Sequence, residues 1–344
     1  SRIVMRLLML AATTTALRCG LRVQRTRARR LATRLPDAPN LRLLDGSDEL
    51  RRGLSADGFV SAKAVDVTRA VREISELQEC LPLAATALGR AIASVVLIAD
   101  GLEADETFQV RFVGDGPLRG VFAVCNGALE TRGYVGNPKV ALDGGVKSGV
   151  GAGQLQVVRL KNLPGEEELS PYSSVVEITS GEIAEDINYY VATSEQREGA
   201  LSAGVSFSDL DAVDGCGGWR VELLPGAPQA VAEHLLKNIQ RVIDEKVTTT
   251  SVLKAGNTCE AVLRLLLDGM EPQLDFDVKH PAFKCDCGID RVYRVLALLP
   301  RDEIQDILDQ NDKIEARCEF CSRLYSLGKD EIAAHFARVD VEDE

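Results

Sequence analysis

The sequence has few of the side chains that most catalytic sites use, and only three of its 344 residues are histidines. None of the three is clearly placed as a general base. A nucleotide-binding loop is also missing, because Val146 separates Lys147 from the glycine that it should follow, and a strand pattern comes next where a Walker motif has a helix. The glycines between 144 and 153 instead suit a close backbone approach and positive φ beside a strand.

Long apolar runs are scarce too, and only Leu81–Ile98 approaches the length of a membrane span. Arg90 lies near its middle, where a charged side chain costs about 2.5 to 3.5 kcal/mol in a bilayer. We therefore expect this segment to be a buried helix of a globular core, and we expect no membrane partner.

Acidic residues are absent from the first 36 positions, which contain nine arginines. This composition is typical of a transit peptide and predicts an organellar protein of the mitochondrial matrix or plastid stroma; a basic tail without a targeting role is the alternative. Of the 40 basic and 52 acidic residues of the whole chain, 31 and 52 lie beyond this segment. Such an acidic balance repels phosphates, so we expect no nucleic-acid partner.

Helical periodicity appears at several places along the chain. Helices are expected at Val60–Leu77 and Leu83–Ile98, and at Glu182–Val191 with a capping box formed by Thr179 and Glu182. Beyond Pro225, the pattern of residues 229–268 predicts two amphipathic helices joined by the polar stretch Thr248–Ser251. Helices of this kind need a partner surface to be stable, which suggests a helical linker.

Strand patterns lie between these helices. Phe108, Val110 and Phe112 alternate with polar residues before the turn Gly114–Pro117 and the apolar run Val121–Val124, a pattern typical of an antiparallel hairpin. Further strands are expected at Leu155–Leu160, Val175–Thr179, Leu201–Phe207 and Trp219–Leu224. Strands and helices without regular βαβ alternation indicate an α+β fold with a mixed or antiparallel sheet and packed helices.

Cysteines are dense only near the end of the chain, where Cys285-Asp-Cys287 and Cys318-Glu-Phe-Cys321 form two close pairs. Four thiolates complete the tetrahedral shell of a structural Zn²⁺ and leave no position for water, so this site would be closed. The one-residue spacing of the first pair departs from the usual two. Two interpretations stay open at this point: a purely structural zinc site, or a redox sensor, because thiolates both bind zinc and react with oxidants.

The segment around these pairs predicts a small module. Arg291–Leu299 and Pro300–Leu308 are expected to be short helices, and their apolar face is too small to fold without a metal. His280 precedes Cys285 by five residues, but four thiols already fill a coordination shell, so we do not expect it to be a ligand. The single cysteines are expected to act as small hydrophobes: Cys80, Cys125, Cys216 and Cys259.

Taken together, these residues resemble the redox-regulated chaperones of the heat-shock protein 33 family, from about Leu54 to Ile332. The most specific parts are Phe283–Cys287 followed by Arg291, and Cys318–Cys321 followed by Tyr325. Gly288 stands where the family often has serine, which touches no ligand, and bacterial members, which are cytoplasmic, lack the basic leader. Upstream blocks also follow in the expected order: Gly114–Pro117, Gly153–Leu155, Pro171–Tyr172, Gly181–Ala184 and Ser194–Gln196.

The resemblance implies an ATP-independent holdase chaperone that is inactive while reduced, with one Zn²⁺ bound by Cys285, Cys287, Cys318 and Cys321. Oxidation would release zinc, join Cys285 to Cys287 and Cys318 to Cys321, and unfold the linker. The chaperone would then form a homodimer and protect unfolded or partially folded client proteins from aggregation. A one-residue separation suits a strained, reducible disulfide.

The corresponding domain organisation has five parts: a transit peptide at 1–36, an α+β core domain at 40–225, a helical redox-responsive linker at 226–280, a zinc-binding redox-switch domain at 281–333 and an acidic tail at 334–344. We predict no enzymatic activity. The alternatives are a thiol-disulfide oxidoreductase that uses Cys318 and Cys321, which lack a thioredoxin-like βαβ context, and a constitutive zinc-stabilised binding protein.

Overall fold

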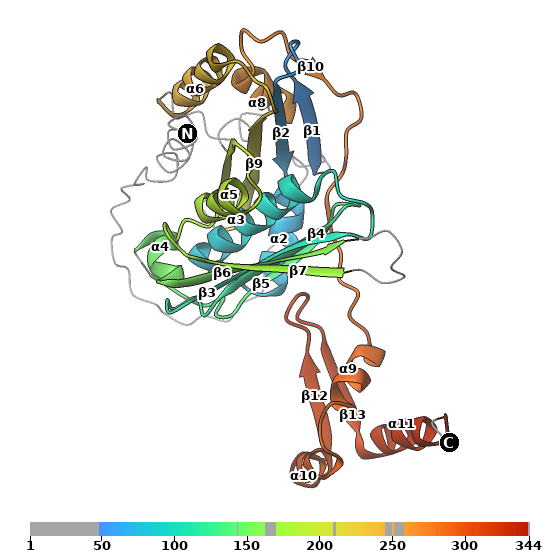
Figure 1. Ribbon diagram of the computed structural model, residues 1–344. Coiled ribbons are helices and arrows are strands. Elements are labelled where there is room, and N and C mark those ends of the chain that lie inside the picture. Colours follow the sequence, from blue (N-terminus) through green and yellow to red (C-terminus); the bar gives the residue numbers. More distant parts are fainter. Residues whose placement is uncertain are drawn as a thin grey trace, which may run out of the picture.

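The computed structural model describes residues 48–142, 144–161, 170–208, 211–244, 250 and 258–342 (Figure 1). These residues form two β-sheets with helices between and around them, followed by a small module that stands apart at the C-terminal end. The predicted α+β class is therefore confirmed. The predicted transit segment lies outside the described residues.

The first sheet has five antiparallel strands in the order β10-β1-β2-β9-β8. The predicted helix at Val60–Leu77 is wrong in its first half, because Val60–Asp66 forms the strand β2. Its residues alternate between two buried faces: Val60, Ala62 and Ala64 pack on one side, whereas Val65 packs on the other. The other strands of this sheet are β1 (Glu49–Leu54), β8 (Gly199–Phe207), β9 (Val213–Leu223) and β10 (Gln273–Leu274).

The second sheet has six strands in the order β11-β5-β4-β3-β6-β7, all antiparallel except for the parallel edge strand β11. The predicted hairpin is confirmed, with Phe108 opposite Cys125 and Phe112 opposite Val121. The sequence patterns did not predict β1, β5, β10 or β11. The strands are β3 (Thr107–Gly114), β4 (Val121–Asn126), β5 (Glu130–Val135), β6 (Gly153–Lys161), β7 (Ser170–Glu177) and β11 (Ala282–Phe283).

Helix α3 (Pro82–Ala99) lies between the two sheets and forms the centre of the core. By length and composition it is apolar enough to cross a membrane, yet 78% of it is buried inside the protein. The predicted buried helix is thus confirmed. Gly89 allows the close packing of this helix, because an added Cβ would lie 2.6 Å from Val205 Cγ2 and 3.0 Å from Cys216 Sγ.

Three shorter helices surround α3: α2 (Thr68–Leu77), α4 (Gly145–Val150) and α5 (Ala184–Ser194). The predicted capping box before α5 is wrong. The carboxylate of Asp186 instead accepts hydrogen bonds from the backbone N–H groups of Thr179, Ser180 and Gly181, at 2.8 to 2.9 Å. Glu182 pairs with Arg90 of α3, so its side chain is not available for the backbone.

The two predicted linker helices are present as α6 (Gln229–Asp244) and α8 (Cys259–Leu266), whereas most of the polar stretch predicted to join them lies outside the described residues. They cover the face of the first sheet that points away from α3. Trp219 of β9 belongs to this apolar cluster and is only 2% exposed. The helices contribute Leu235, Ile239, Cys259, Val262, Leu263 and Leu266.

An extended segment, residues 273–284, connects these helices to the C-terminal module and is called the strap below. It pairs with β1 through β10, exchanges two backbone hydrogen bonds with Leu50 at Lys279 (2.8 and 3.1 Å), and then pairs with β5 through β11. The strap therefore lies on the edge of both sheets in turn (Figure 1). Because an edge strand offers unpaired backbone groups, these hydrogen bonds hold an otherwise irregular chain in place.

The C-terminal module, residues 285–342, combines short helices with a two-stranded hairpin (Figure 1). Its predicted helices are confirmed as α9 (Ile289–Leu296) and α10 (Arg301–Asn311), and the hairpin strands are β12 (Lys313–Arg317) and β13 (Leu324–Gly328). Helix α11 (Lys329–Glu342) extends into the segment expected as an acidic tail. The apolar cluster is small: Leu296, Ile304, Leu308, Leu327, Ile332 and Phe336.

Candidate metal centre

Four cysteine sulfurs meet where the strap enters the C-terminal module. They belong to Cys285, Cys287, Cys318 and Cys321, and all four lie within 4.8 Å of one another. The first two follow β11 directly, and the other two lie in the turn between β12 and β13. The structure thus brings together the four residues that the sequence singled out, although the two pairs are thirty residues apart.

The arrangement of the sulfurs fits a tetrahedral metal ion. Sγ of Cys285 lies 3.7 Å from Sγ of Cys318, and Sγ of Cys287 lies 3.3 Å from Sγ of Cys321. Ligand sulfurs at about 2.3 Å from a tetrahedral Zn²⁺ would lie about 3.8 Å apart. These four residues could therefore hold a metal ion, and soft thiolate ligands favour zinc over the hard cations calcium and magnesium.

The backbone of the hairpin turn places its two sulfurs on one side. The N–H of Cys318 donates to the carbonyl of Arg323, and the N–H of Ser322 donates to the carbonyl of Cys318, both at 2.9 Å. Ser322 has a φ of +57°, in the left-handed region. This tight turn brings Cys318 and Cys321 to the end of the hairpin, where they face the first pair.

Tyr325 of β13 contacts one of the thiols directly. Its hydroxyl donates a hydrogen bond of 3.1 Å to Sγ of Cys287. Burial opposes ionisation of Cys287, but the hydrogen bonds from Tyr325 and the neighbouring thiols outweigh it and lower its pKa to about 7. Burial raises the pKa of Cys285 to about 12. The cluster therefore contains one thiol that ionises readily even before a metal binds.

The other cysteines that the structure describes, and His280, are placed elsewhere. Cys125, Cys216 and Cys259 are buried, and burial raises the pKa of each thiol, as expected for small hydrophobic side chains. Cys80 is half-buried, and burial raises the pKa of its thiol to about 12. Nδ1 of His280 lies 2.9 Å from the carbonyl oxygen of Asp48, so this side chain contacts the core.

A buried ion cluster fastens the strap to the core. Asp100, at the end of α3, has no exposed side-chain surface and lies close to Arg52, Lys63 and Lys279. Burial opposes its ionisation, but the hydrogen bond from Arg52 and the two lysines hold its pKa below the usual range. Lys279 belongs to the strap, so one charge of the cluster comes from the segment that leads to the cysteines.

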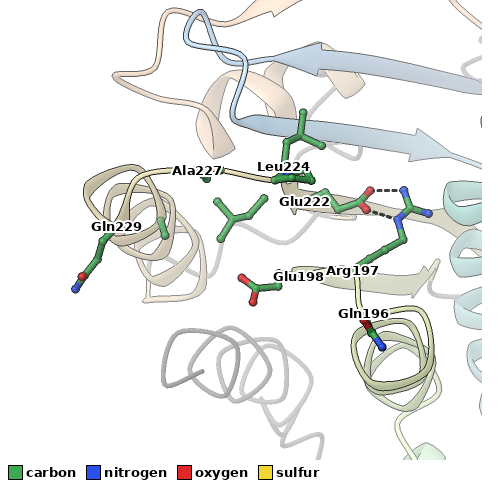
Figure 2. A pocket seen from close by; sticks show the side chains of 11 residues that line it. Gln196, Arg197, Glu198, Glu222, Leu224, Ala227 and Gln229 are labelled. Carbon is green, nitrogen blue, oxygen red and sulfur yellow. Dashed lines mark hydrogen bonds and ion pairs between the residues drawn. The ribbon is translucent and has the colours of Figure 1, made fainter.

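A separate cavity of about 650 Å³ lies beside the start of α6 (Figure 2). Two of its charged lining residues pair with each other, because Nη2 of Arg197 donates a hydrogen bond of 2.8 Å to Glu222. Arg220 lies 3.0 Å from the same carboxylate. Figure 2 shows Arg197 and Glu222 pointing toward each other across the ends of α5 and β9. Within the part of the chain that the structure describes, no cysteine or histidine lines this cavity.

Comparison with known proteins agrees with this architecture. The chain is 32% identical over 295 residues to the 33 kDa chaperonin of Clostridium perfringens, covering 83% of this chain and 90% of that protein. It is 35% identical over 294 residues to the 33 kDa chaperonin of Nostoc, covering 83% and 95%. The crystal structure of the 33 kDa chaperonin from Thermotoga maritima, a heat shock protein 33 homologue, matches with a TM-score of 0.75 and 30% identity, covering 86% of this chain and all of that one.

The fold is therefore that of a class of chaperones. The family model described as Hsp33 protein matches residues 48–328, and the chain belongs to this family.

Sequence patterns missed the residues that connect the cysteines to the core. Asp100 follows a long apolar helix as a single acid, and Lys279 stands in a segment without clear periodicity. Neither position belongs to a motif, because the pair forms between residues that are 179 positions apart. Arg132 of β5 was missed for the same reason, although it contacts Asp286 and Phe320, one residue from each cysteine pair.

Proposed function

We propose that this protein is a redox-regulated, ATP-independent holdase whose four clustered thiols sense oxidants. The observation that carries the proposal is the gathering of four sulfurs within 4.8 Å at the end of the strap. In the reduced state Cys285, Cys287, Cys318 and Cys321 would hold one Zn²⁺. The bound zinc would supply the cross-link that the small apolar cluster of the module lacks.

Oxidation would remove the ligand set by converting thiolates to disulfides. Each pair, Cys285 with Cys287 and Cys318 with Cys321, would give two electrons to peroxide, which takes up two protons and leaves as two waters. The two disulfides formed would leave no thiolate to bind a metal.

The strap offers a physical path from the cysteines to the apolar face under α6 and α8. It begins next to α8, pairs with the edges of both sheets and ends at Cys285. If the module unfolds, the strap loses its anchor at one end, and the backbone pairs at β11 and β10 become easier to open. Undocking of the two helices would then expose Val60, Ala62, Trp219 and their neighbours, an apolar surface suited to unfolded or partially folded clients.

The proposed function is tested by the aggregation of a thermally unfolding model enzyme, followed by light scattering. We expect the reduced, zinc-loaded protein to give little protection, the peroxide-treated protein to suppress scattering at about equimolar ratio, and re-reduction with zinc to restore the inactive state. Equal protection before and after oxidation with retained zinc would instead indicate a constitutive binding protein. Turnover of a small disulfide substrate would indicate a thiol-disulfide oxidoreductase.

Matched serine variants separate the metal site from the other thiols. Cys285→Ser and Cys321→Ser should each lower zinc content and alter the response to peroxide, because each removes one of four ligands. Cys125→Ser is the control, since this thiol is buried in the core and is not one of the four clustered sulfurs. Loss of regulation in the control as well would mean that the response does not come from the four clustered cysteines.

Three further features belong to the same proposal. The domain boundaries inferred from the sequence stay predictions, as does an organellar location addressed by residues 1–36. Homodimerisation after oxidation is also predicted. Size-exclusion chromatography with light scattering, before and after peroxide treatment, tests the dimer. Imaging of a tagged chain with and without residues 1–36 tests whether this segment targets the protein to an organelle.

A further inference from the structure

The C-terminal module touches the core through the residues that stand between its cysteines. Asp286, between the first pair, accepts an ion pair of 2.9 Å from Arg132 of β5. Phe320, between the second pair, lies under the same arginine, with the guanidinium carbon 5.1 Å from the ring centroid. One side chain of the core therefore contacts both cysteine-containing segments.

The ring of Phe320 is held in an aromatic cradle formed by Phe122, Arg132 and Tyr134. Phe122 of β4 and Tyr134 of β5 stack on each other with centroids 5.3 Å apart. Both meet the ring of Phe320 edge to face, at 5.8 and 5.4 Å. This is the geometry that aromatic pairs prefer.

The backbone of Phe320 is recognised as well as its ring. Nε2 of Gln78 donates one hydrogen bond of 3.1 Å to the carbonyl of Phe320 and another of 2.8 Å to the carbonyl of Gly133. Gln78 is 9% exposed, so it is fixed at the end of α2. The core thus binds an aromatic ring together with the peptide carbonyl of the same residue. Any polypeptide that contains phenylalanine offers this combination.

We propose that this cradle is a binding site for aromatic side chains of unfolding clients, and that Phe320 occupies it as an internal substitute in the reduced state. The inference rests on the proposed function and deepens it. Phe320 lies between Cys318 and Cys321, so joining those two sulfurs changes the turn that presents its ring. Oxidation then frees Phe122, Arg132 and Tyr134 for a phenylalanine of the client, and Nε2 of Gln78 donates a hydrogen bond to the backbone carbonyl of that phenylalanine.

A photoreactive peptide tests the cradle directly. The probe is a decapeptide of glycine, serine and lysine with one benzoylphenylalanine at its centre, and the cross-linked residues of the full chain are identified by mass spectrometry. We expect cross-links to β4 and β5 in the oxidised wild type and few in the reduced one. A competing peptide with phenylalanine at its centre should be about tenfold more effective than one with alanine.

Phe320→Leu separates the cradle from the redox chemistry. This variant keeps the four cysteines but removes the ring, so the reduced, zinc-loaded protein should label at β4 and β5 without oxidation. Phe276→Leu is the matched control, because Phe276 is fully exposed, and it should behave as wild type. Phe122→Ala should abolish labelling both in the oxidised wild type and in the reduced Phe320→Leu variant. If Phe122→Ala does not fold, Arg132→Gln is used in its place.

The outcomes distinguish this inference from the proposed function. If the oxidised protein protects clients but the probe labels another surface, or if Phe122→Ala and Arg132→Gln leave labelling intact, the cradle is not a client site and the holdase proposal stands. If labelling at β4 and β5 appears in Phe320→Leu while oxidised wild type gives no protection, the proposed function fails and the cradle stands. Occupation by Phe320 of a second copy would block the probe in the oxidised dimer, which also overturns the inference.

Discussion

The ammonium nitrogen of Lys279 lies 3.0 Å from a carboxylate oxygen of Asp100, which ties the strap to the buried end of the central helix. Asp100 also pairs with Arg52 and Lys63, so its charge stays compensated if the strap leaves. The contact can therefore break without leaving a buried charge unpaired. This is the property expected of a reversible attachment.

Replacement of Lys279 by methionine should loosen the strap without unfolding the core. Loss of one charge-assisted hydrogen bond should lower the free energy of local strap opening by about 1 kcal/mol. We expect faster hydrogen exchange at the amides that bond to the two sheets, those of Lys279, Ala282 and Lys284. Zinc release by peroxide should be about fivefold faster.

Lys284→Met is the control for this prediction. Lys284 pairs with Glu130, but its side chain is 53% exposed, so water and salt already weaken the pair. Its replacement should change strap exchange less than that of Lys279. Equal effects of the two variants, or unchanged exchange in Lys279→Met, would show that the Asp100 contact does not hold the strap.

The single tryptophan reports on the helices that cover the first sheet. Trp219 is 2% exposed beneath α6 and α8, so its emission in the reduced protein should be that of a buried indole. Oxidation should shift the emission to the red as the helices undock, and Trp219→Phe should remove the signal. Protection of clients without any shift would mean that the active form keeps α6 and α8 in place.

Tyr325→Phe should weaken the metal site without removing a ligand. The variant loses the hydrogen bond from the hydroxyl to Cys287, and loss of such outer contacts typically costs about 10- to 100-fold in metal affinity. Competition with a chelator of known affinity under reducing conditions measures the change. Tyr293→Phe is the control, because that ring stacks on His335 with centroids 3.8 Å apart and touches none of the four sulfurs. Equal affinities for both variants would contradict the role given to Tyr325.

The carboxyl group of Asp48 should make stability depend on pH near neutrality. Burial raises its pKa to about 6, although its carboxylate accepts hydrogen bonds from the amides of Arg69 and Ala70. The unfolded value is about 3.9, so the folded state binds the proton more tightly, and the free energy of unfolding rises as the pH falls through 6.

Asp48→Asn removes this titration and tests the sign. Between pH 7.5 and 5, the wild type should gain about 1 kcal/mol in free energy of unfolding relative to the variant, as measured by urea denaturation. Asp57→Asn is the control, because its exposed carboxyl group has a pKa that the Ser55 hydroxyl lowers, outside this pH range. Parallel pH profiles for wild type and Asp48→Asn would contradict the prediction.

Much of the fold could be predicted where one periodicity dominated. The apolar segment of α3 and the alternation through Phe108, Val110 and Phe112 each indicated one structure, and the structure has it. The prediction for Val60–Leu77 failed in its first half because the helical spacing comes from the later residues of the segment, whereas Val60, Ala62 and Ala64 alternate as in a strand. This alternating part forms β2, which pairs with β1 and β9. The predicted capping box before α5 does not form because Glu182 pairs with Arg90 of helix α3.

The candidate metal centre could be predicted because the spacing of thiols within each pair is local. The contacts that link it to the core could not, because they join residues far apart in sequence. Arg132 meets Asp286 and Phe320 only after β5 has been placed beside the strap. Gln78 likewise reaches Phe320 across 242 positions. Local sequence patterns do not indicate such pairs, because the pairs form only once the sheet topology brings the residues together.

The most direct test of the account follows zinc release and client aggregation in one sample during stepwise addition of peroxide at a temperature that unfolds the client. Free zinc is read with a chromogenic chelator, and aggregation is read by light scattering. The account predicts that about one zinc per chain is released and that protection rises in proportion to it, with both reversed by reductant and added zinc. Full protection while zinc stays bound, or complete zinc release without protection, would contradict it.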